Sequence, residues 1–520
     1  MVKLAGPVTA AEMLWEAAHQ EPDRPCLTDL DAERVETLDY AQLGERVAAV
    51  AGGLMSLGLA VGDRVALLLH NSTAYVEAYL GAIAAGLVVV PLNVRLSGDD
   101  YLHMLTDSGS AVLVTTGDFV DRFPELAAVP DITVVRADGH HGGELGLAEL
   151  ATSARPLSGP VPRPASDPAS LMYTSGTTGS PKAVVLSHHS WRSVADTAVD
   201  VLGMGADEVT LHVAPLTHGA GFLLLPTLQL GGHNLLCRSY DADRTLRLWS
   251  EWRVTGMVMV PSMIRMLLDA RKPGERIPES LRRLYYAGSP IDRDTMREAT
   301  EAFGGRLIQS FAQMESPMFF TVLSQDDHRG VLDDADSPLA RSAGRVLDGV
   351  QLRIVDDEGQ TLPSGEAGEI LARAPQTMSG YWCRPAATKD TLADGWLHTG
   401  DIGYLDGESY LYVVDRKKDM IVTGGSNVYA REVEEALLDL PEVKDAAVIG
   451  MPHRIWGEAV TAVLVAASGE QDSDAVIAAC RSRLAGYRVP KQVYWVDELP
   501  RNAYGKVLKR HIREQLEAAL

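Results

Sequence analysis

Cysteine is scarce in this chain of 520 residues, which contains only four: Cys26, Cys237, Cys383 and Cys480. They lie far apart, and no two of them form a Cys-x-x-Cys pair. This spacing argues against a disulfide framework and against a zinc site built on paired cysteines. It is typical of a protein in a reducing compartment, so we expect a cytoplasmic location.

Positive charge is also in short supply. The chain has 47 Lys and Arg against 70 Asp and Glu, a formal net charge of −23. Because nucleic acids require a basic surface, we expect no nucleic-acid partner. The acidic excess is spread along the chain, as on a solvated surface. A nucleotide such as ATP needs only local positive charge and is not excluded.

Long hydrophobic runs are missing as well. The most apolar stretch, residues 78–94, is interrupted by Gly81, Gly86 and Pro91. It predicts a buried helix followed by a buried strand, and we expect no membrane span. Residues 1–20 lack a basic segment followed by an apolar core, so we also expect no signal peptide.

What the chain does contain is a repeated alternation of apolar strands and helices. In the first half, it predicts helices over 40–57 and 73–85 and strands over 65–69, 88–91, 112–115 and 132–135. This alternation predicts an α/β protein with a parallel or mixed sheet covered on both faces. The last part predicts a small α+β unit, with helices over 430–438 and 473–484 and strands over 443–449, 458–465 and 492–496. The length is sufficient for two or more domains.

One stretch is rich in glycine and hydroxyl side chains: Tyr173-Thr174-Ser175-Gly176-Thr177-Thr178-Gly179-Ser180-Pro181-Lys182. Apolar runs on either side read as strands. Glycines let the backbone N–H groups approach a phosphate, hydroxyls donate to its oxygens, and lysine supplies a positive charge. The spacing is not that of a Walker loop. The stretch therefore predicts a phosphate-binding loop between two strands.

This stretch closely resembles the YTSGTTGxPKG signature of the adenylate-forming superfamily, which includes acyl-CoA synthetases, luciferases and peptide-synthetase adenylation domains. Ala183 is the departure, standing where the family usually has Gly. Gly395 to Asp401 matches the family's GWLHTGD, and Pro500 to Lys506 resembles its PRxxxGK loop. With other motifs, the resemblance extends over nearly the whole chain.

The resemblance implies the fold and the domain boundaries. We expect a large N-terminal α/β domain of layered sheets with a small β-barrel unit, and a small, mobile α+β C-terminal domain. The large domain would span residues 1–415, the hinge residues 416–418, and the small domain residues 419–520.

The resemblance also implies which residues hold the nucleotide. Phe311 would stack on adenine, Asp401 would accept the ribose hydroxyls, Arg416 would reach the ribose or phosphates, and Lys418 would be the pivot of the hinge. A narrow pantetheine arm could pass over Gly424 and Gly425. The full set of expected nucleotide and cofactor residues is Thr174, Ser175, Gly176, Thr177, Thr178, Gly179, Lys182, Gly288, Ser289, Pro290, Phe311, Ala312, Met314, Asp401, Arg416, Lys418, Gly424 and Gly425.

Three residues carry the expected catalytic roles. The resemblance implies that Glu315 holds Mg²⁺, an ion that prefers oxygen ligands, and that Lys506 bridges the substrate carboxylate and the α-phosphate. It also implies that His218 lines the acyl pocket and gates the thiol channel. Met314 replaces the family's threonine beside Glu315, which removes a hydrogen-bonding hydroxyl.

The expected substrate pocket is bordered by His218, Gly219, Gly221, Phe222, Tyr286 and Ala287. Gly and Ala leave room there, and Phe and Tyr offer flat faces. These residues favour an aromatic or medium-length acid.

Four functions remain open from the sequence. The first is ATP-dependent adenylation of a small carboxylic acid followed by transfer to the thiol of CoA, in which positioned cations stabilise the charge that develops at the α-phosphate. The second, suggested by the departures at Met314 and Ala183, activates nitrite and converts an arylamine to a diazo compound. A third loads the acyl group onto an acyl carrier protein, and the fourth, less favoured, is a nucleotide-binding protein without turnover. We expect a monomer or a homodimer.

Overall fold

The computed structural model describes residues 9–139, 145–174, 181–217, 219–272, 274–334, 336–469, 471–501 and 507–519. By their contacts, they divide into two compact units. Unit 1 comprises Met1–Gln351 and Ala372–Leu397, and unit 2 comprises Leu352–Leu371 and His398–Leu520. The α/β class expected from the sequence is confirmed. The boundary expected at residues 416–418 falls inside unit 2 and stays a prediction.

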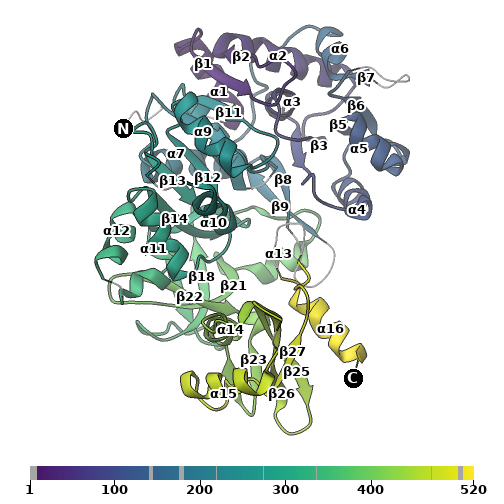
Figure 1. Ribbon diagram of the computed structural model, residues 1–520. Helices are drawn as coiled ribbons and strands as arrows, with labels where there is room; N and C mark the ends of the chain where they lie inside the picture. Colours follow the sequence, from purple (N-terminus) through teal and green to yellow (C-terminus); the bar gives the residue numbers. More distant parts are fainter. Residues whose placement is uncertain are drawn as a thin grey trace. The chain divides into compact units, whose positions relative to one another are not determined.

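An eight-stranded sheet in unit 1 contains the strands of the expected phosphate loop (Figure 1). Its order is β19-β9-β8-β4-β3-β5-β6-β7. The strands are β3 (Arg64–Leu68), β4 (Val88–Pro91), β5 (Val112–Thr115), β6 (Thr133–Arg136), β7 (Leu145–Gly146), β8 (Pro168–Thr174), β9 (Lys182–Ser187) and β19 (Gly380–Tyr381). The strands from β8 to β7 run parallel, whereas β9 is antiparallel to both β8 and β19. The central strands are buried apolar runs, as a covered parallel sheet requires.

Helices connect these strands, and their first turns are capped by side chains. The carboxylate of Asp39 accepts a hydrogen bond from the backbone of Gln42 at the start of α2, and Ser72 and Ser97 cap α3 and α4 in the same way. The helices of this part are α2 (Tyr40–Ser56), α3 (Thr73–Ala84), α4 (Gly98–Ser108), α5 (Gly117–Arg122), η1 (Pro124–Ala128) and α6 (Leu147–Thr152). The apolar stretch at 78–94 is thus a buried helix and strand, as predicted.

Unit 1 contains a second set of hydrogen-bonded strands, in the order β16-β15-β14-β13-β12-β10-β11-β1-β2. Their bounds are β1 (Pro25–Asp29), β2 (Thr37–Asp39), β10 (Val209–His212), β11 (His233–Leu236), β12 (Gly256–Met259), β13 (Arg283–Tyr286), β14 (Leu307–Gln313), β15 (Ser316–Leu323) and β16 (Gly344–Val346). From β14 to β1 the strands are parallel, and β15 turns back antiparallel. The carboxyl ends of the parallel strands therefore share one edge, where ligands bind in such sheets.

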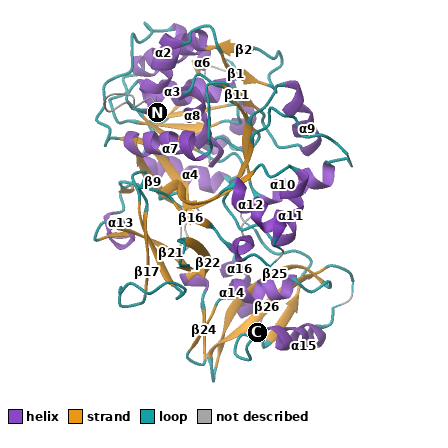
Figure 2. Ribbon diagram, turned by 90° about the vertical axis from the view of Figure 1, so that its left-hand side faces the viewer, coloured by secondary structure: helices purple, strands orange, loops and turns teal. Residues whose placement is uncertain are grey.

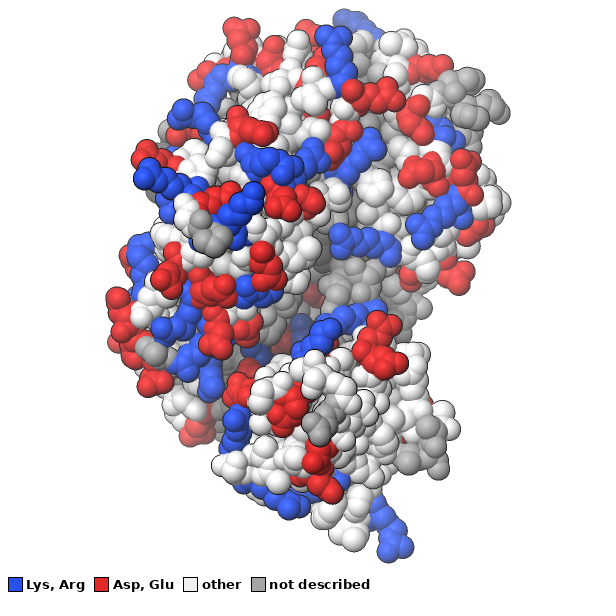
Figure 3. Space-filling model, viewed as in Figure 1, with Lys and Arg blue, Asp and Glu red and all other residues white. Residues whose placement is uncertain are grey.

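The helices that accompany this second set alternate with its strands. They are α1 (Ala10–Gln20), α7 (His188–Val201), η2 (Gly219–Leu223), α8 (Leu224–Gln229), α9 (Ala242–Glu251), α10 (Pro261–Ala270), α11 (Arg293–Ala302), α12 (Gln325–Asp333), η3 (Pro338–Arg341) and, late in the chain, α13 (Pro385–Thr391) with the short strand β20 (Leu392–Ala393). On the face of unit 1 seen in Figure 3, acidic and basic side chains are interspersed and do not gather into one basic patch.

The β-barrel unit expected from the sequence is not formed. The strands concerned are β17 (Gln351–Val355), β18 (Gly368–Arg373), β21 (Trp396–Leu405) and β22 (Tyr410–Arg416). They are neighbours in that order, and β17 is the end of the sheet among the described residues. A barrel would require β17 to pair with the far strand as well, so the short strands with turns form an open sheet instead.

The last part of unit 2 matches the predicted α+β elements closely (Figure 2). It consists of η4 (Lys417–Asp419), β23 (Ile421–Thr423), β24 (Ser426–Val428), α14 (Ala430–Leu438), β25 (Val443–His453), β26 (Gly457–Ala466), α15 (Ser473–Arg483), β27 (Gln492–Trp495) and α16 (Lys509–Ala519). Apolar residues of α14, β25 and β26 form its core. Lys509 at the start of α16 lies with its Nζ 2.7 Å from Glu434 Oε1 on α14, which joins the two helices.

No described helix is both long enough and apolar enough to cross a lipid bilayer.

Candidate functional site

The strands on either side of the expected phosphate loop are those predicted. Thr174 ends β8 and Lys182 begins β9, and the two residues face each other across the antiparallel pair. The hydroxyl of Thr174 donates to the carbonyl of Lys182 over 3.5 Å. The loop residues Ser175, Gly176, Thr177, Thr178 and Gly179 lie outside the described residues. The pairing nevertheless fixes both ends of the loop.

Ala183, the residue that departs from the family signature, fits its place in β9. It is 1% exposed, belongs to a hydrophobic cluster and faces Tyr173 across the strands. Its φ is not positive, so no backbone conformation here demands glycine. The substitution therefore adds a packed methyl group without a conformational cost.

Two expected nucleotide segments share the carboxyl edge of the parallel strands. Tyr286 pairs with Gln309 in the register of β13 and β14, so the turn Ala287–Pro290 follows β13 beside the last residues of β14. Gly288, Ser289 and Pro290 are exposed, and Phe311 and Ala312 are partly buried. The ring of Phe311 lies 6.1 Å from that of Phe320, at 55°. The edge thus offers an open turn and an aromatic face, as the adenine role requires.

Glu315 and Lys182 contact the same side chain, Tyr381. Glu315 lies with Met314 in the turn between β14 and β15, and its Oε1 accepts a hydrogen bond of 2.7 Å from the Tyr381 hydroxyl. The Nζ of Lys182 lies 5.2 Å from the centroid of the Tyr381 ring. Burial, and then the charge of Glu315, raise the pKa of Tyr381, so this hydroxyl remains a donor. Tyr381 was not among the predicted site residues, although the motif Gly380-Tyr381-Trp382 marks its position.

The surroundings of Glu315 fit a magnesium ion held together with ATP. The described residues include no cluster of three or more His, Cys, Asp or Glu that could bind a metal alone. Mg²⁺ in nucleotide sites commonly uses one or two carboxylates and the phosphates of the substrate. Tyr381 is the hydrogen-bond donor to the Glu315 carboxylate among the described residues, and it occupies only Oε1. The remaining oxygen capacity suits a cation.

The expected substrate pocket is only partly supported. His218 lies outside the described residues, and Gly219 begins η2. Position 221 requires glycine, because a Cβ there would lie 2.1 Å from the carbonyl oxygen of Leu216. Phe222 is 3% exposed and stacks on Trp191, with ring centroids 4.7 Å apart. Phe222, which follows His218 in the sequence, thus belongs to an aromatic pair with Trp191 of α7.

Tyr286 does not present its ring as the pocket prediction requires. Its side chain is fully buried, and its hydroxyl lies 2.9 Å from His328 Nε2 on α12 and 3.2 Å from Gln309 Oε1. Successive residues of a strand point to opposite faces, so Tyr286 faces α12. The adjacent Ala287 is partly exposed at the strand end and remains compatible with a pocket.

In unit 2, Asp401 and Arg416 form an ion pair. They face each other across β21 and β22, and Arg416 Nε lies 2.6 Å from Asp401 Oδ1. Asp401 is 2% exposed, and its backbone N–H donates to the hydroxyl of Thr399. Lys418 follows in η4, where partial removal from water lowers its pKa. The two predicted ribose residues are therefore brought together.

Gly424 and Gly425 form a tight turn between β23 and β24. Their φ values are +58° and +80°, and Thr423 pairs with Ser426 on either side. Positive φ at both central residues is the mark of a type I′ hairpin turn, which favours glycine. Both glycines are exposed, and the N–H of Gly424 donates to the carbonyl of Trp456. The two glycines are therefore exposed in a hairpin turn, and their contact with a pantetheine arm stays a prediction. Lys506 lies outside the described residues.

An aromatic and cationic patch adjoins this turn. The Trp456 ring is stacked on His453 at 4.2 Å, and Lys491 Nζ lies 5.6 Å from the Trp456 ring centroid. Trp456 is 38% exposed and Ile455 73% exposed. We define the Trp456 patch as His453, Ile455, Trp456 and Lys491. The sequence interpretation missed it, although Trp456-Gly457-Glu458 is a distinctive string at the start of β26.

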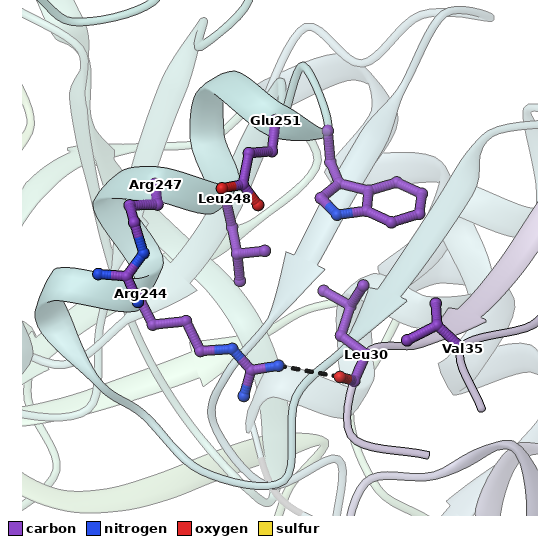
Figure 4. A pocket seen from close by; sticks show the side chains of 7 residues that line it. Leu30, Val35, Arg244, Arg247, Leu248 and Glu251 are labelled. Carbon is purple, nitrogen blue, oxygen red and sulfur yellow. Dashed lines mark hydrogen bonds between the residues drawn. The ribbon is translucent and has the colours of Figure 1, made fainter. Parts of the chain in front are cut away.

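Two cavities formed by described residues of unit 1 can be compared with the predicted site. One of about 290 Å³ lies between α9 and the Leu30–Val35 loop, and Figure 4 shows Arg244 reaching Leu30 there, away from every predicted site residue. The other, of about 530 Å³, is lined by Val185 of β9, by Tyr381 and by residues near Tyr381 in the sequence, among them Thr388 and Leu392. Only the second adjoins the side chain that links Lys182 and Glu315.

Comparison with known proteins agrees with this arrangement. Residues 14–382 match the model of the AMP-binding enzyme family, and residues 432–506 match that of the AMP-binding enzyme C-terminal domain. Similar curated proteins include a feruloyl-CoA synthase of an Amycolatopsis species, 38% identical over 92% of this chain and 94% of its own. A fatty acid–[acyl-carrier-protein] ligase of Streptomyces coeruleorubidus is 33% identical over 92% of both.

Among solved structures, the O-succinylbenzoate coenzyme A synthetase of Bacillus subtilis in complex with ATP and magnesium is 30% identical, with a TM-score of 0.84. The alignment covers 96% of this chain and 98% of that one. The family match spans more than half of the chain, and it includes Lys182, Glu315 and Tyr381. The chain is therefore a member of the AMP-binding enzyme family, the adenylate-forming enzymes.

Proposed function

We propose that this protein is an ATP-dependent ligase that converts a carboxylic acid to its acyl-adenylate and then to its CoA thioester. The observation that carries the proposal is the placement of a cation, Lys182, and a carboxylate, Glu315, on one tyrosine of unit 1. Such a pair suits a nucleotide whose phosphates need positive charge and whose magnesium needs an oxygen ligand.

The first step joins two anions. A carboxylate oxygen attacks the α-phosphorus of ATP, the bond to the bridging oxygen breaks, and pyrophosphate leaves. Lys182 would bind the phosphates, Glu315 would hold the magnesium, and Lys506 would bring the carboxylate and the α-phosphate together. Asp401 and Arg416 would bind the ribose. Magnesium supplies positive charge to the phosphates, and the chain's own residues supply their orientation.

In the second step a thiol attacks the acyl carbon and AMP leaves. The thiol would approach along the exposed turn of Gly424 and Gly425. Beside it, the Trp456 patch offers a flat aromatic face and the charge of Lys491. A nucleotide-bearing thiol such as CoA can use both, through stacking of its base and neutralisation of its phosphate.

The substrate class is proposed to be aromatic or medium-length acids. Phe222, which follows His218 in the sequence, stacks on Trp191 of α7. The likeness to a feruloyl-CoA synthase favours the aromatic choice.

Transfer to an acyl carrier protein is the second candidate, because one similar protein is a fatty acid–[acyl-carrier-protein] ligase. The diazo-forming reaction receives less support, since Ala183 is accommodated without strain and no longer marks an altered loop.

The test is a panel of acids with ATP and Mg²⁺, read by release of pyrophosphate and AMP. The panel holds ferulic acid, benzoic acids and saturated acids of six to sixteen carbons, each with and without CoA. We expect pyrophosphate with at least one aromatic or medium-length acid, and AMP turnover only when CoA is added. Turnover with an acyl carrier protein but not with CoA would select the second candidate, and CoA-independent turnover with nitrite and an arylamine would overturn both.

A further inference from the structure

Among the described residues, Tyr381 contacts both Lys182 and Glu315 through its side chain. Its hydroxyl donates to Glu315 Oε1 over 2.7 Å, and its ring lies 5.2 Å from Lys182 Nζ. No ion pair joins Lys182 directly to Glu315 among the described residues, although the two carry opposite charges. One phenol therefore stands between the cation and the carboxylate.

Backbone hydrogen bonds fix Tyr381 on both sides. It belongs to β19 and faces Val184 on β9, the strand that begins with Lys182. The N–H of the next residue, Trp382, donates to the carbonyl of Ala183 over 2.9 Å. The N–H of Tyr381 itself donates to the Thr388 hydroxyl over 2.9 Å. The phenol ring thus keeps a set position relative to the loop strand.

Glu315 is tied to the same segment through its backbone. Its carbonyl accepts a hydrogen bond of 2.8 Å from the N–H of Met378, three residues before Tyr381. The main chain and the side chain of Glu315 are therefore both held by residues 378–381. Two contacts from this short segment therefore restrict the position of Glu315 in its turn.

The two contacts of Tyr381 have different chemical effects. A hydroxyl that donates to a carboxylate orients it and leaves the other oxygen for a metal, as partners of metal ligands commonly do. The ring face attracts the ammonium without neutralising it. A direct pair of Lys182 with Glu315 would instead cancel the charges that phosphate and magnesium need. The phenol keeps both charges in place and available.

We propose that Tyr381 is a positioning residue of the nucleotide site, whose hydroxyl orients Glu315 toward magnesium and whose ring holds Lys182 toward the phosphates. The inference rests on the proposed function and names a residue that acts through two others.

The test separates the two contacts with two variants and one control. Tyr381→Phe keeps the ring and removes the hydroxyl, and Tyr381→Leu removes both. Tyr412→Phe is the matched control, because the Tyr412 hydroxyl also donates to a carboxylate, that of Asp406, over 3.3 Å in unit 2. Binding of Mn²⁺, in place of Mg²⁺, is measured by electron paramagnetic resonance with ATP present and no acid. Binding of ATP without metal is measured by calorimetry.

We expect Tyr381→Phe to raise the Kd of Mn²⁺ about tenfold, the lower end of what loss of a ligand's hydrogen-bond partner costs. Metal-free ATP should bind this variant as it binds the unaltered chain. Tyr381→Leu should in addition raise the Kd of metal-free ATP by about twofold to fivefold, the scale of an exposed cation–π contact. Tyr412→Phe should change neither constant.

A double-mutant cycle with Glu315→Gln makes the test specific. If Tyr381 acts through Glu315, adding Tyr381→Phe to Glu315→Gln should leave the Kd of Mn²⁺ unchanged. Equal Mn²⁺ binding by the unaltered chain and Tyr381→Phe overturns the role of the hydroxyl. Tighter binding of metal-free ATP by Tyr381→Leu overturns the role of the ring, because the ring would then sequester Lys182.

A Tyr381→Phe chain that fails to fold, or that melts earlier with its Mn²⁺ constant unchanged, also overturns the proposal in favour of a structural role. These binding measurements need no acid substrate. Failure of the ligase function would appear separately, as an unaltered chain that binds Mn²⁺ and ATP yet releases no pyrophosphate with any acid.

Discussion

Asp401 and Arg416 hold each other across β21 and β22, with 2.6 Å between Arg416 Nε and Asp401 Oδ1. The arginine fixes one carboxylate oxygen, and this orients the group for the two hydroxyls of a ribose. Asp401→Asn should therefore raise the KM for ATP by about tenfold to a hundredfold, because a hydrogen bond to a charged group is worth about 1.5–3 kcal/mol. The measurement is the initial rate of pyrophosphate release against ATP concentration. Asp357→Asn, at an exposed carboxylate of the same unit, is the control, and an unaltered KM in Asp401→Asn would refute the ribose role.

Lys506 is assigned to the adenylation step, and Lys506→Ala should abolish acyl-adenylate formation while ATP still binds. The reason is that the lysine stabilises the charge shared by the carboxylate and the α-phosphate, which exists only as the reaction proceeds. Pyrophosphate exchange reports the chemistry, and calorimetry reports ATP binding. Lys444→Ala, at an exposed position of β25, serves as the control. Normal exchange in Lys506→Ala would remove the residue from the mechanism.

Trp456 is expected to bind the nucleotide end of CoA. Trp456→Ala should raise the KM for CoA by about tenfold, in the range of one base stacked on an aromatic ring, and leave acid-dependent pyrophosphate exchange unaltered. Tyr487→Ala removes another exposed aromatic of unit 2, 41% exposed, and should not change the KM. If transfer to an acyl carrier protein is slowed instead and CoA is not a substrate, the patch binds a protein acceptor.

The ion pair between Lys509 and Glu434, whose side chains are largely withdrawn from solvent, should stabilise unit 2. Lys509→Met leaves the Glu434 carboxylate without its cation, and we expect a loss of about 3 kcal/mol in the free energy of unfolding. Arg513→Ala breaks the more exposed pair with Glu458 and should cost under about 1 kcal/mol. Urea unfolding followed by circular dichroism measures both. Equal losses in the two variants would contradict the stabilising role of burial.

His328 makes the folded protein sensitive to acid. Burial lowers its pKa to about 4, and its ring lies between the Ser324 carbonyl, 2.7 Å from Nδ1, and the Tyr286 hydroxyl, 2.9 Å from Nε2. An unfolded histidine has a pKa of about 6.5. Between these values the unfolded state binds more protons, so stability is present above pH 6.5 and is lost as pH falls toward 4.

Between pH 7 and pH 5, we expect His328 to lower the free energy of unfolding by about 2 kcal/mol. His328→Gln should flatten the decline in unfolding free energy over that interval, because one proton-binding group of the unfolded chain is gone. His511→Gln, at an exposed histidine, should leave the decline as it is. Urea unfolding at both pH values measures the slope, and an identical slope in His328→Gln would contradict the prediction.

Much of the fold follows from local patterns in the sequence. Helix α14 spans the predicted residues without a shift, and α15 begins where Asp472 caps it. Such signals lie within a few residues of each other, so they can be read from the chain directly. Closure of a sheet cannot be read in this way, which is why the barrel prediction failed.

In the candidate site, too, features with a local sequence signal were predicted and features that depend on distant residues were not. The ends of the phosphate loop, Glu315 and the pair Asp401 and Arg416 were predicted from motifs. The structure places the loop ends and Arg416 at strand ends, Glu315 in a turn and Asp401 within β21. Tyr381 was missed because its contact with Glu315 joins residues 66 positions apart. Tyr286 is buried against His328 of α12, a position that the sequence did not predict, because strand periodicity gives two faces but does not tell which one meets a ligand.

Strand β19 has a consequence for the order in which the chain acquires its structure during synthesis. Strands β8 and β9 are adjacent in sequence and can pair early, but β19 covers β9 only after residue 381 has left the ribosome. Until then β9 is an edge strand with unpaired backbone groups, a template for association with other chains. A nascent or truncated product ending before residue 380 should therefore aggregate through β9 and lack an ordered Lys182, even though its phosphate loop is complete.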